Sequence, residues 1–360
     1  MQYLPNIFFA LAFAVGIGFF VMNIRKLSRN IKLGKDVNRA DRKSERFKNM
    51  MMIALGQSKM VKRPFSGFLH IIVYVGFIII NIEVLEIIID GLLGTHRIFL
   101  SVIPASVYGF LIGTFEVLAV LVLVTVIIFW LRRNVSNIKR FMSAEMKGWP
   151  KNDGNYILYF EIVLMTLFLT MNATDTAFQE AGTGNVISQF IVPFFDGYSP
   201  EALHTIERTA WWIHILGILT FLNYLYYSKH LHILLAFPNT YFANLNPKGQ
   251  FNNLESVTNE VKLMMDPDAD PYAMPEEGAE EVVPEKFGAS DVTDLNWVQL
   301  LNAYTCTECG RCTSSCPANL TGKKLSPRKI MMDTRDRLEE VGRNIDANNG
   351  EFKDDGKQLL

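Results

Sequence analysis

The chain has 360 residues, of which 49% are hydrophobic and 12% aromatic. This composition is too apolar for an ordinary soluble protein, so it indicates a membrane protein long enough to form two domains. The net charge of −1 conceals an uneven distribution, because basic residues lie beside apolar segments and acidic residues are concentrated in 266–294. Membrane topology explains the basic residues, and no nucleic-acid partner is implied.

Five apolar segments approach or exceed the roughly 20 residues needed to cross a bilayer. They are residues 4–24, 66–90, 106–131, 156–174 and 209–237. The first lacks the basic start of a cleaved signal peptide, so we expect it to remain as a span. Thirteen Lys or Arg residues lie between the first two segments and six between the third and fourth, against one in each alternate loop. The positive-inside rule therefore predicts an inner-membrane protein with its N-terminus outside and its C-terminus in the cytoplasm.

All four cysteines lie in one run with the spacing C-x2-C-x2-C-x3-C-P: Cys306, Cys309, Cys312 and Cys316. This spacing is typical of 4Fe–4S proteins, in which three cysteines bind one cluster and the fourth, followed by proline, binds a second. A zinc site is the alternative, but zinc ribbons use two C-x2-C pairs about 15 to 20 residues apart. The run predicts an iron–sulfur site and half of the ligands of a two-cluster module.

Two helices are expected around the cysteines. Asp294 is a plausible N-cap for a helix over 295–304, and Ser326-Pro327 has the pattern of the N-cap and first residue of a second helix. Together they indicate an α-helical ferredoxin module over 287–360. The preceding 246–286 is an acidic, Pro-rich linker, which is either a solvated tether or a strap against the basic loops.

Histidines near the ends of the apolar segments are candidate haem ligands. His70 and His232 lie at similar depths near the predicted cytoplasmic face, as the two axial ligands of one haem b require. In a continuous helix His214 would share a face with His232 about 27 Å away, so it could serve a second haem or a quinone carbonyl. His230 would point away from the bundle. The alternative is that these histidines lie at the membrane interface without binding a cofactor. Lys229 is expected to lie there too, with its side chain extended to the lipid headgroups.

Carboxylates also occur inside the predicted membrane domain. Glu83, Glu86 and Asp90 share one face of the second segment, and Glu116 and Glu161 lie in neighbouring segments. Buried charges in a bilayer are costly, so Glu83 is expected to be protonated or partnered. The residue either belongs to a proton route to a quinone or makes a hydrogen bond between helices.

These motifs resemble known membrane redox proteins. The segments RPFSGFLH at 63–70, WWIH at 211–214 and SKHLH at 228–232 are similar to the cytochrome b of the nitrate reductase gamma and heterodisulfide reductase E group. The cysteine run resembles heterodisulfide reductase subunits C and D and the C subunit of anaerobic glycerol-3-phosphate dehydrogenase. The order of the two parts is similar to fused iron–sulfur oxidoreductases related to heterodisulfide reductase, some of which are proposed to link electron-transfer flavoprotein to menaquinone.

The resemblance implies an all-α membrane protein with a five-helix cytochrome b-like domain over 1–245 and the incomplete ferredoxin module. Two departures are evident: the gamma-type proteins have a second histidine ten residues after the first, where this chain has Ile80, and no second cysteine run precedes Leu360. The first departure removes the histidine that would bind an outer haem from the second segment. The second is expected from a truncated sequence, with completion by a partner as the alternative.

The predicted function is that of a membrane electron-transfer subunit. Electrons would pass between cytoplasmic 4Fe–4S clusters and a quinone through haem b, with the substrate chemistry on a soluble partner such as a CCG-repeat iron–sulfur subunit or electron-transfer flavoprotein. One rival is a cytochrome b anchor with a docking tail that lacks a cluster. The other is a non-redox sensor or assembly protein with a zinc-binding tail.

Overall fold

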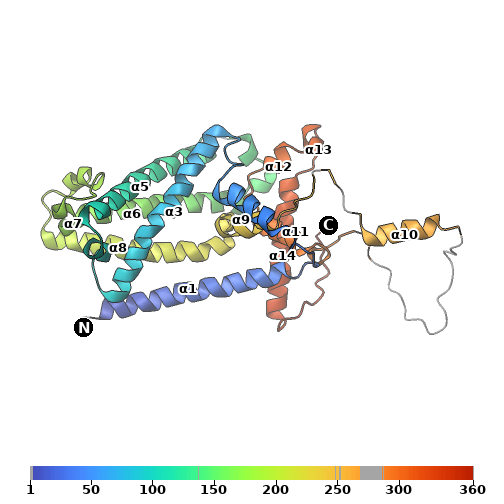
Figure 1. Cartoon of the computed structure of the whole chain (residues 1–360), viewed down its shortest axis with the longest axis horizontal. Coiled ribbons are helices and arrows are strands. Elements are labelled where there is room, and N and C mark those ends of the chain that lie inside the picture. Colours follow the sequence, from blue (N-terminus) through green and yellow to red (C-terminus); the bar gives the residue numbers. More distant parts are fainter. Residues whose placement is uncertain are drawn as a thin grey trace.

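The computed structural model describes residues 3–136, 138–247, 249–250, 253–267, 286 and 288–359. Within these ranges the chain is helical and has no strand, which confirms the all-α prediction. Five long helices lie side by side (Figure 1). They are α1 (Leu4–Ile31), α3 (Pro64–Leu93), α5 (Ala105–Asn134), α6 (Trp149–Thr174) and α8 (Pro200–Tyr224).

The five long helices form a closed ring. Each contacts its neighbours in the order α3, α5, α6, α8, α1 and back to α3. Large apolar side chains from these helices fill the interior, including Phe9, Ile112, Phe115, Phe168 and Ile215. Such a bundle offers facing positions for a cofactor between its helices.

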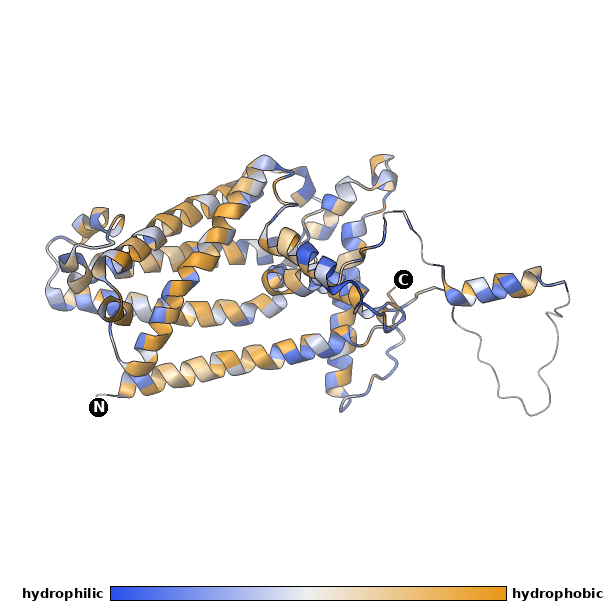
Figure 2. Ribbon diagram, in the orientation of Figure 1, coloured by the Kyte–Doolittle hydropathy of each residue, from blue (hydrophilic) through white to orange (hydrophobic). Residues whose placement is uncertain are grey.

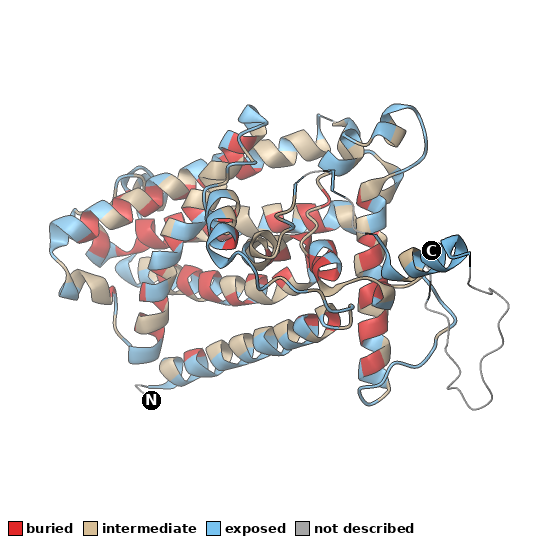
Figure 3. Cartoon of the chain, turned by 45° about the vertical axis from the view of Figure 1, so that its right-hand side comes forward, coloured by how far each residue is buried: buried red, intermediate tan, exposed pale blue. Residues whose placement is uncertain are grey.

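Four of the long helices, α1, α3, α5 and α6, are long and apolar enough to cross a membrane. Their outer faces remain apolar and exposed (Figures 2 and 3), and only 6% of the apolar window of α1 is buried. Exposed apolar surface of this extent is stable in lipid and not in water. The first four predicted segments all lie within these helices, so the chain is a membrane protein.

The fifth predicted segment, 209–237, is not one helix. α8 ends at Tyr224 and is followed by the 3₁₀ turns η6 (Leu225–Tyr227) and η7 (Lys229–Leu231), and then by α9 (His232–Tyr241). Ser228 Oγ accepts a hydrogen bond from His230 N, and Asp153 Oδ2 accepts one from Lys229 N at 3.2 Å. The two side-chain oxygens thus bind backbone N–H groups that would donate to backbone carbonyls in a continuous helix.

An uninterrupted span at 209–237 is therefore a wrong prediction. The expected shared face of His214 and His232 rested on that continuous helix and is wrong as well. α8 belongs to the ring of long helices, but it is not among the four that meet the length and hydropathy expected of a span in the described residues. The count of five membrane spans is thus not confirmed.

Shorter elements connect the long helices at both ends of the bundle. At the end that carries most of the Lys and Arg residues, called the basic end below, they are α2 (Lys43–Met50), η1 (Met51–Leu55), η2 (Lys139–Phe141) and η3 (Ala144–Met146). At the opposite end they are α4 (Ile98–Val102), α7 (Thr176–Ala181), η4 (Ser188–Phe190) and η5 (Val192–Phe195).

The cysteines lie in a C-terminal helical segment. Its elements are α10 (Glu255–Met265), η8 (Val292–Asp294), α11 (Trp297–Tyr304), α12 (Arg311–Ser314), α13 (Pro317–Leu320) and α14 (Pro327–Ala347). α14 begins where predicted, with Ser326 as its N-cap. The helix before the cysteines is capped by Asn296 and not, as predicted, by Asp294, which belongs to η8.

The linker predicted for 246–286 is described only in part. α10 lies in it and projects from the rest of the molecule (Figure 1). Most of the acidic, Pro-rich stretch, residues 268–285, lies outside the described residues. Whether it forms a tether or a strap therefore stays a prediction.

The segment from α11 to α14 packs on the basic end of the bundle. Asn30 at the end of α1 donates a hydrogen bond to the Tyr304 hydroxyl at 3.0 Å. The buried guanidinium of Arg328 binds the Glu145 carboxylate at 2.7 Å and the Arg140 carbonyl at 2.8 Å. A second apolar core joins the parts, with Leu27, Leu231, Leu235, Leu300, Leu301, Leu338 and Val341. The cysteines are thereby held against the histidine-bearing end of the bundle.

Candidate iron–sulfur and histidine site

The four cysteines lie on a tightly folded loop and two short helical turns. Cys306 and Cys309 follow α11, Cys312 is in α12, and Cys316 is the N-cap of α13. Glu308 and Gly310 both have left-handed backbone, with φ of 54° and 71°. Because a non-glycine residue in this conformation costs about 1 kcal/mol, the surrounding contacts must hold Glu308 in place.

The cysteine loop fits an iron–sulfur cluster. All four thiols are free, Cys312 is exposed, and the other three are half-buried. Burial opposes ionisation of Cys309, but hydrogen bonds from Arg311 and Thr307 outweigh it and hold the pKa of this thiol below its ordinary value. The thiolate is the form that binds metal, so the surroundings of Cys309 favour ligation, whereas burial raises the pKa of the Cys306 thiol.

Arg140 and Arg311 bring positive charge to this loop. Arg140 of η2 lies within electrostatic range of Cys309 and of three more guanidiniums, those of Arg63, Arg132 and Arg311. A 4Fe–4S cluster with four thiolate ligands carries net negative charge, which nearby cations offset. The chemistry of the donor set and its positive surroundings both fit such a cluster.

One buried ion pair links the cysteine loop to the bundle. The Glu308 carboxylate binds the Lys229 ammonium group of η7, and its other oxygen accepts a hydrogen bond from Arg335 of α14 at 2.9 Å. The Lys229 side chain is 6% exposed and the Glu308 side chain 2%. The prediction that Lys229 reaches toward the lipid headgroups is therefore wrong.

The structure places three histidines near one another at the basic end. His70 is in the second turn of α3, His230 is in η7, and His232 begins α9. His70 lies within electrostatic range of His232, of His230 and of Arg311 in the cysteine loop. The rings of His230 and His232 are 5.8 Å apart. The predicted partners His70 and His232 thus lie in one region, together with a histidine that the sequence analysis set aside.

The ring nitrogens of this group fit haem ligation. His232 Nδ1 contacts the Lys229 carbonyl at 3.1 Å, and His230 Nδ1 contacts Ser228 Oγ at 3.1 Å. A histidine ligand commonly donates its second ring N–H to a backbone or side-chain oxygen, which fixes the tautomer and leaves Nε2 for the metal. Both residues have this arrangement, so either could pair with His70.

His214 occupies a different place. It is buried in α8, and the centroid of its ring lies 6.2 Å from that of Phe168. Two further histidines lie at the opposite end of the bundle. His96 lies just before α4, and His204 lies near the start of α8. A role for His214 in a second haem or at a quinone stays a prediction.

Three of the candidates share a feature that calls for an explanation. His70 Nδ1, His214 Nδ1 and Glu83 Oε2 are buried and have no hydrogen-bond partner in the described part of the chain. Five further side chains there have such an atom: Arg39, Tyr74, Arg133, Arg140 and Asn223. Buried polar atoms are normally satisfied, and a bound cofactor is one group that can satisfy them.

The carboxylates of α3 enter a hydrogen-bonded network toward the opposite end of the bundle. Glu86 accepts hydrogen bonds from Phe99 N at 2.8 Å and from the Tyr108 hydroxyl at 3.2 Å. Asp90 accepts one from Arg97 N at 2.7 Å. Glu86 and Asp90 thus make structural hydrogen bonds, whereas Glu83 keeps an oxygen without a partner in the described residues.

Arg97 is the centre of this network, and the sequence analysis treated it only as a loop cation. Its guanidinium donates to Asp175 at 2.7 Å, to Asn172 at 2.9 Å and to the Tyr108 hydroxyl at 3.2 Å. Asn172 in turn donates to Glu116 at 3.0 Å. One buried cation thus ties α3, α5 and α6 together.

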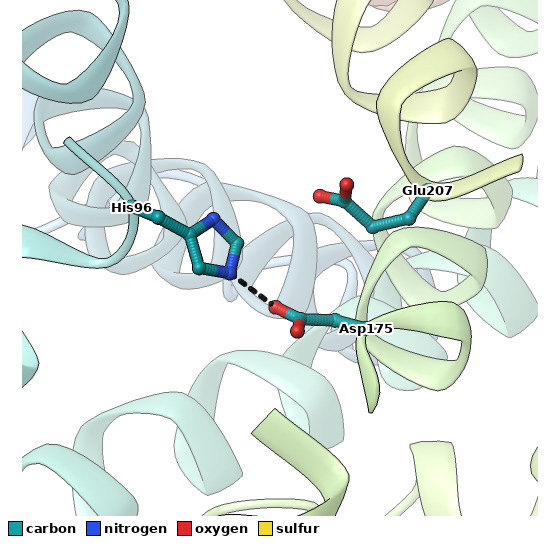
Figure 4. Close-up of side chains that lie close together, drawn as sticks. All are labelled: His96, Asp175 and Glu207. Atoms are coloured by element: carbon teal, nitrogen blue, oxygen red, sulfur yellow. Dashed lines mark ion pairs between the residues drawn. The ribbon is translucent and has the colours of Figure 1, made fainter. Parts of the chain in front are cut away.

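Figure 4 shows His96, Asp175 and Glu207 converging beside this network. One ligand atom from each lies within 4.8 Å of the others. However, His96 and Arg97 both bind Asp175 Oδ2, at 3.0 and 2.7 Å, and Arg208 binds Glu207. The carboxylates already have cationic partners, so the group is an ion-pair cluster.

Asp175→Asn is expected to destabilise the protein by about 3 kcal/mol, because it leaves buried Arg97 without its closest charge. The asparagine oxygen can still cap α7, as Asp175 does by accepting from Phe178 N. Burial opposes ionisation of Asp175, but His96 and Arg97 outweigh it and lower its pKa. The stabilisation is therefore complete above about pH 4, and it is lost as pH falls through the lowered pKa. Thermal unfolding of both proteins at one pH near 8 should show this difference, and equal stability would contradict the role of Arg97.

The curated relatives of the chain agree with an iron–sulfur site. It is 30% identical over 337 residues to a Bacillus subtilis protein named "Probable iron-sulfur-binding oxidoreductase FadF", covering 93% of this chain and 43% of that protein. It is 23% identical over 309 residues to the "EtfAB:quinone oxidoreductase" of Syntrophomonas wolfei, covering 81% of this chain and 38% of the relative. The relatives support an iron–sulfur oxidoreductase.

A shorter similarity covers 47 residues, at 41% identity, of a Chromohalobacter salexigens protein named "Probable membrane-anchored ferredoxin". This match covers 13% of the chain and 7% of that protein. The chain thus spans less than half the length of the curated relatives that it matches. It matches no family model, and no solved structure is significantly similar to it.

Proposed function

We propose that the protein is a membrane-bound electron-transfer subunit that connects an iron–sulfur cluster with a quinone through haem b. Cys306, Cys309 and Cys312 would hold one 4Fe–4S cluster and Cys316 would contribute to a second. His70 would pair with His232 or His230 to hold the haem. The observation that carries the proposal is the position of the cysteine loop against three histidines, through Lys229 and Glu308. Among the relatives, the name of the Syntrophomonas protein supports the quinone link.

Each part of the chain has its own task in this proposal. Bound haem and cluster would each take up and release one electron at a time. α3, η7 and α9 hold the three histidines half-buried at the basic end of the bundle, and Arg140 offsets negative charge at Cys309. The free oxygen of Glu83 could hold a proton for a quinone, since reduction of a quinone needs two electrons and two protons. His214 is the candidate for a quinone carbonyl or a second haem.

The proposal places the basic end in the cytoplasm and the N-terminus outside, in line with the distribution of Lys and Arg. The exposed Cys312 then faces the compartment of a soluble partner. By the name of the second relative, electron-transfer flavoprotein is the first candidate, and an iron–sulfur subunit is the alternative. Substrate chemistry would belong to that partner.

Reoxidation by a quinone tests this function in both wild type and Glu83→Gln. Purified protein is reduced with dithionite, freed of excess reductant and mixed anaerobically with a soluble menaquinone analogue. We expect rapid loss of the reduced haem band in wild type and at least tenfold slower loss in Glu83→Gln, because the variant cannot exchange a proton. The reduced spectrum itself should be unchanged. A protein that keeps its electrons in the presence of quinone would contradict the proposal.

A further inference from the structure

The ion pair between Lys229 and Glu308 belongs to a larger buried group of charges. Lys229 Nζ also donates a hydrogen bond to the Pro150 carbonyl at 2.6 Å and lies 3.7 Å from Asp153 Oδ2. Glu308 is bound a second time, by Arg335 at 2.9 Å. Two cations and two anions therefore meet where η7, α6, α14 and the cysteine loop come together.

The positions of the two partners in the chain give this group its importance. Glu308 lies between Cys306 and Cys309, and its left-handed backbone shapes the loop there. Lys229 immediately precedes His230, and its carbonyl contacts His232 Nδ1 at 3.1 Å. One ion pair thus connects the cysteine loop directly with the histidine-bearing turn.

Stability alone is a weak explanation for such a pair. Removing two charges from water is expensive, and apolar residues of similar size in place of a buried ion pair often stabilise a protein equally well or better. A charged pair does have one property that an apolar pair lacks, since each charge acts on the electrostatic potential of its surroundings. The cysteine loop, to which Glu308 itself belongs, is a group on which that potential has a chemical consequence.

We infer that Lys229 is a positioning residue that, through Glu308, holds the cysteine loop against the histidine turn and sets the reduction potential of the cluster. This inference rests on the proposed function. Reduction adds one negative charge at the cysteine loop, so the Lys229 cation favours it and the Glu308 anion opposes it. The two charges therefore affect the potential in opposite directions.

The experiment is an anaerobic redox titration of the whole protein, followed by electron paramagnetic resonance of the reduced cluster. Lys229→Met is expected to lower the potential and Glu308→Gln to raise it, each by at least a tenfold change in the reduction equilibrium, about 59 mV for one electron. The double variant should return toward wild type, and Lys229→Arg should stay close to it. Lys324→Met removes an exposed charge of the same segment and serves as the control.

A second readout reports the positioning role without the cluster signal. Amide hydrogen exchange at 229–232 and 305–311 should become at least tenfold faster in Lys229→Met and stay unchanged in the Lys324→Met control. Potentials that are unaltered, or that shift in the same direction in both single variants, would overturn the inference. A wild-type protein without any cluster signal would instead contradict the proposed function.

Discussion

Replacing Cys309 by alanine is expected to abolish the iron–sulfur cluster. Cys309 is half-buried at the centre of the cysteine loop, and its surroundings lower the pKa of its thiol. Loss of this ligand leaves an incomplete set for the cluster. Protein-bound iron and sulfide, together with the paramagnetic signal after dithionite reduction, should fall to background.

The nearby exposed Ser315 offers a matched control, because Ser315→Ala leaves all four thiols in place. This variant should keep the iron content and the signal of wild type. The haem band should survive in both variants, because its ligands lie on α3, η7 and α9 and not on the loop. Full retention of iron in Cys309→Ala would show that the cysteine run is not the cluster site, and zinc in place of iron would favour the zinc-binding alternative.

Replacing His70 by alanine is expected to remove the absorption of haem b. His70 is the only one of the three neighbouring histidines that α3 contributes, and its Nδ1 is buried without a partner. Without an axial ligand from α3, a six-coordinate haem cannot form between the helices. The measurement is the reduced-minus-oxidised spectrum of purified protein, normalised to protein concentration.

Parallel variants identify the second ligand and control for general damage. Of His230→Ala and His232→Ala, the one that removes the haem band names the partner of His70. His204→Ala removes an exposed histidine at the opposite end of the bundle and should leave the spectrum unchanged. If His70→Ala kept its full haem band, the ligands would have to lie elsewhere.

Features that depend on local sequence were predicted well. Apolar segments of bilayer length gave four of the long helices, and Ser326-Pro327 marked the start of α14 correctly. These signals are local, because length, hydropathy and capping chemistry require no knowledge of distant contacts. The same is true of the cysteine run, whose assignment as an iron–sulfur site agrees with the names of the relatives.

The break after Tyr224 could not be predicted in the same way. It depends on Asp153, which is 76 residues from Lys229 and accepts its backbone N–H. Hydropathy alone made 209–237 look continuous, and the error removed His230 from consideration. The available signal was a lysine within one apolar segment and an aspartate just before another, because buried opposite charges tend to pair.

Long-range charge networks were the other feature missed. Arg97 joins three helices of the bundle, and Glu308 joins the cysteine loop to η7. In the sequence each looked like an ordinary loop residue, because its partners come from distant parts of the chain. The candidate ligands could be identified from their residue type and their depth in the predicted spans. The residues that position them could be identified only from the three-dimensional structure.

The reduced-minus-oxidised spectrum of the purified wild-type protein tests the central claim most directly. We expect the α-band of a bis-histidine haem b together with the broad bleaching of an iron–sulfur cluster, both from this one chain. A spectrum without the haem band would contradict the electron path from the cysteine loop to the bundle. A haem band without cluster bleaching would instead favour a cytochrome b anchor with a docking tail.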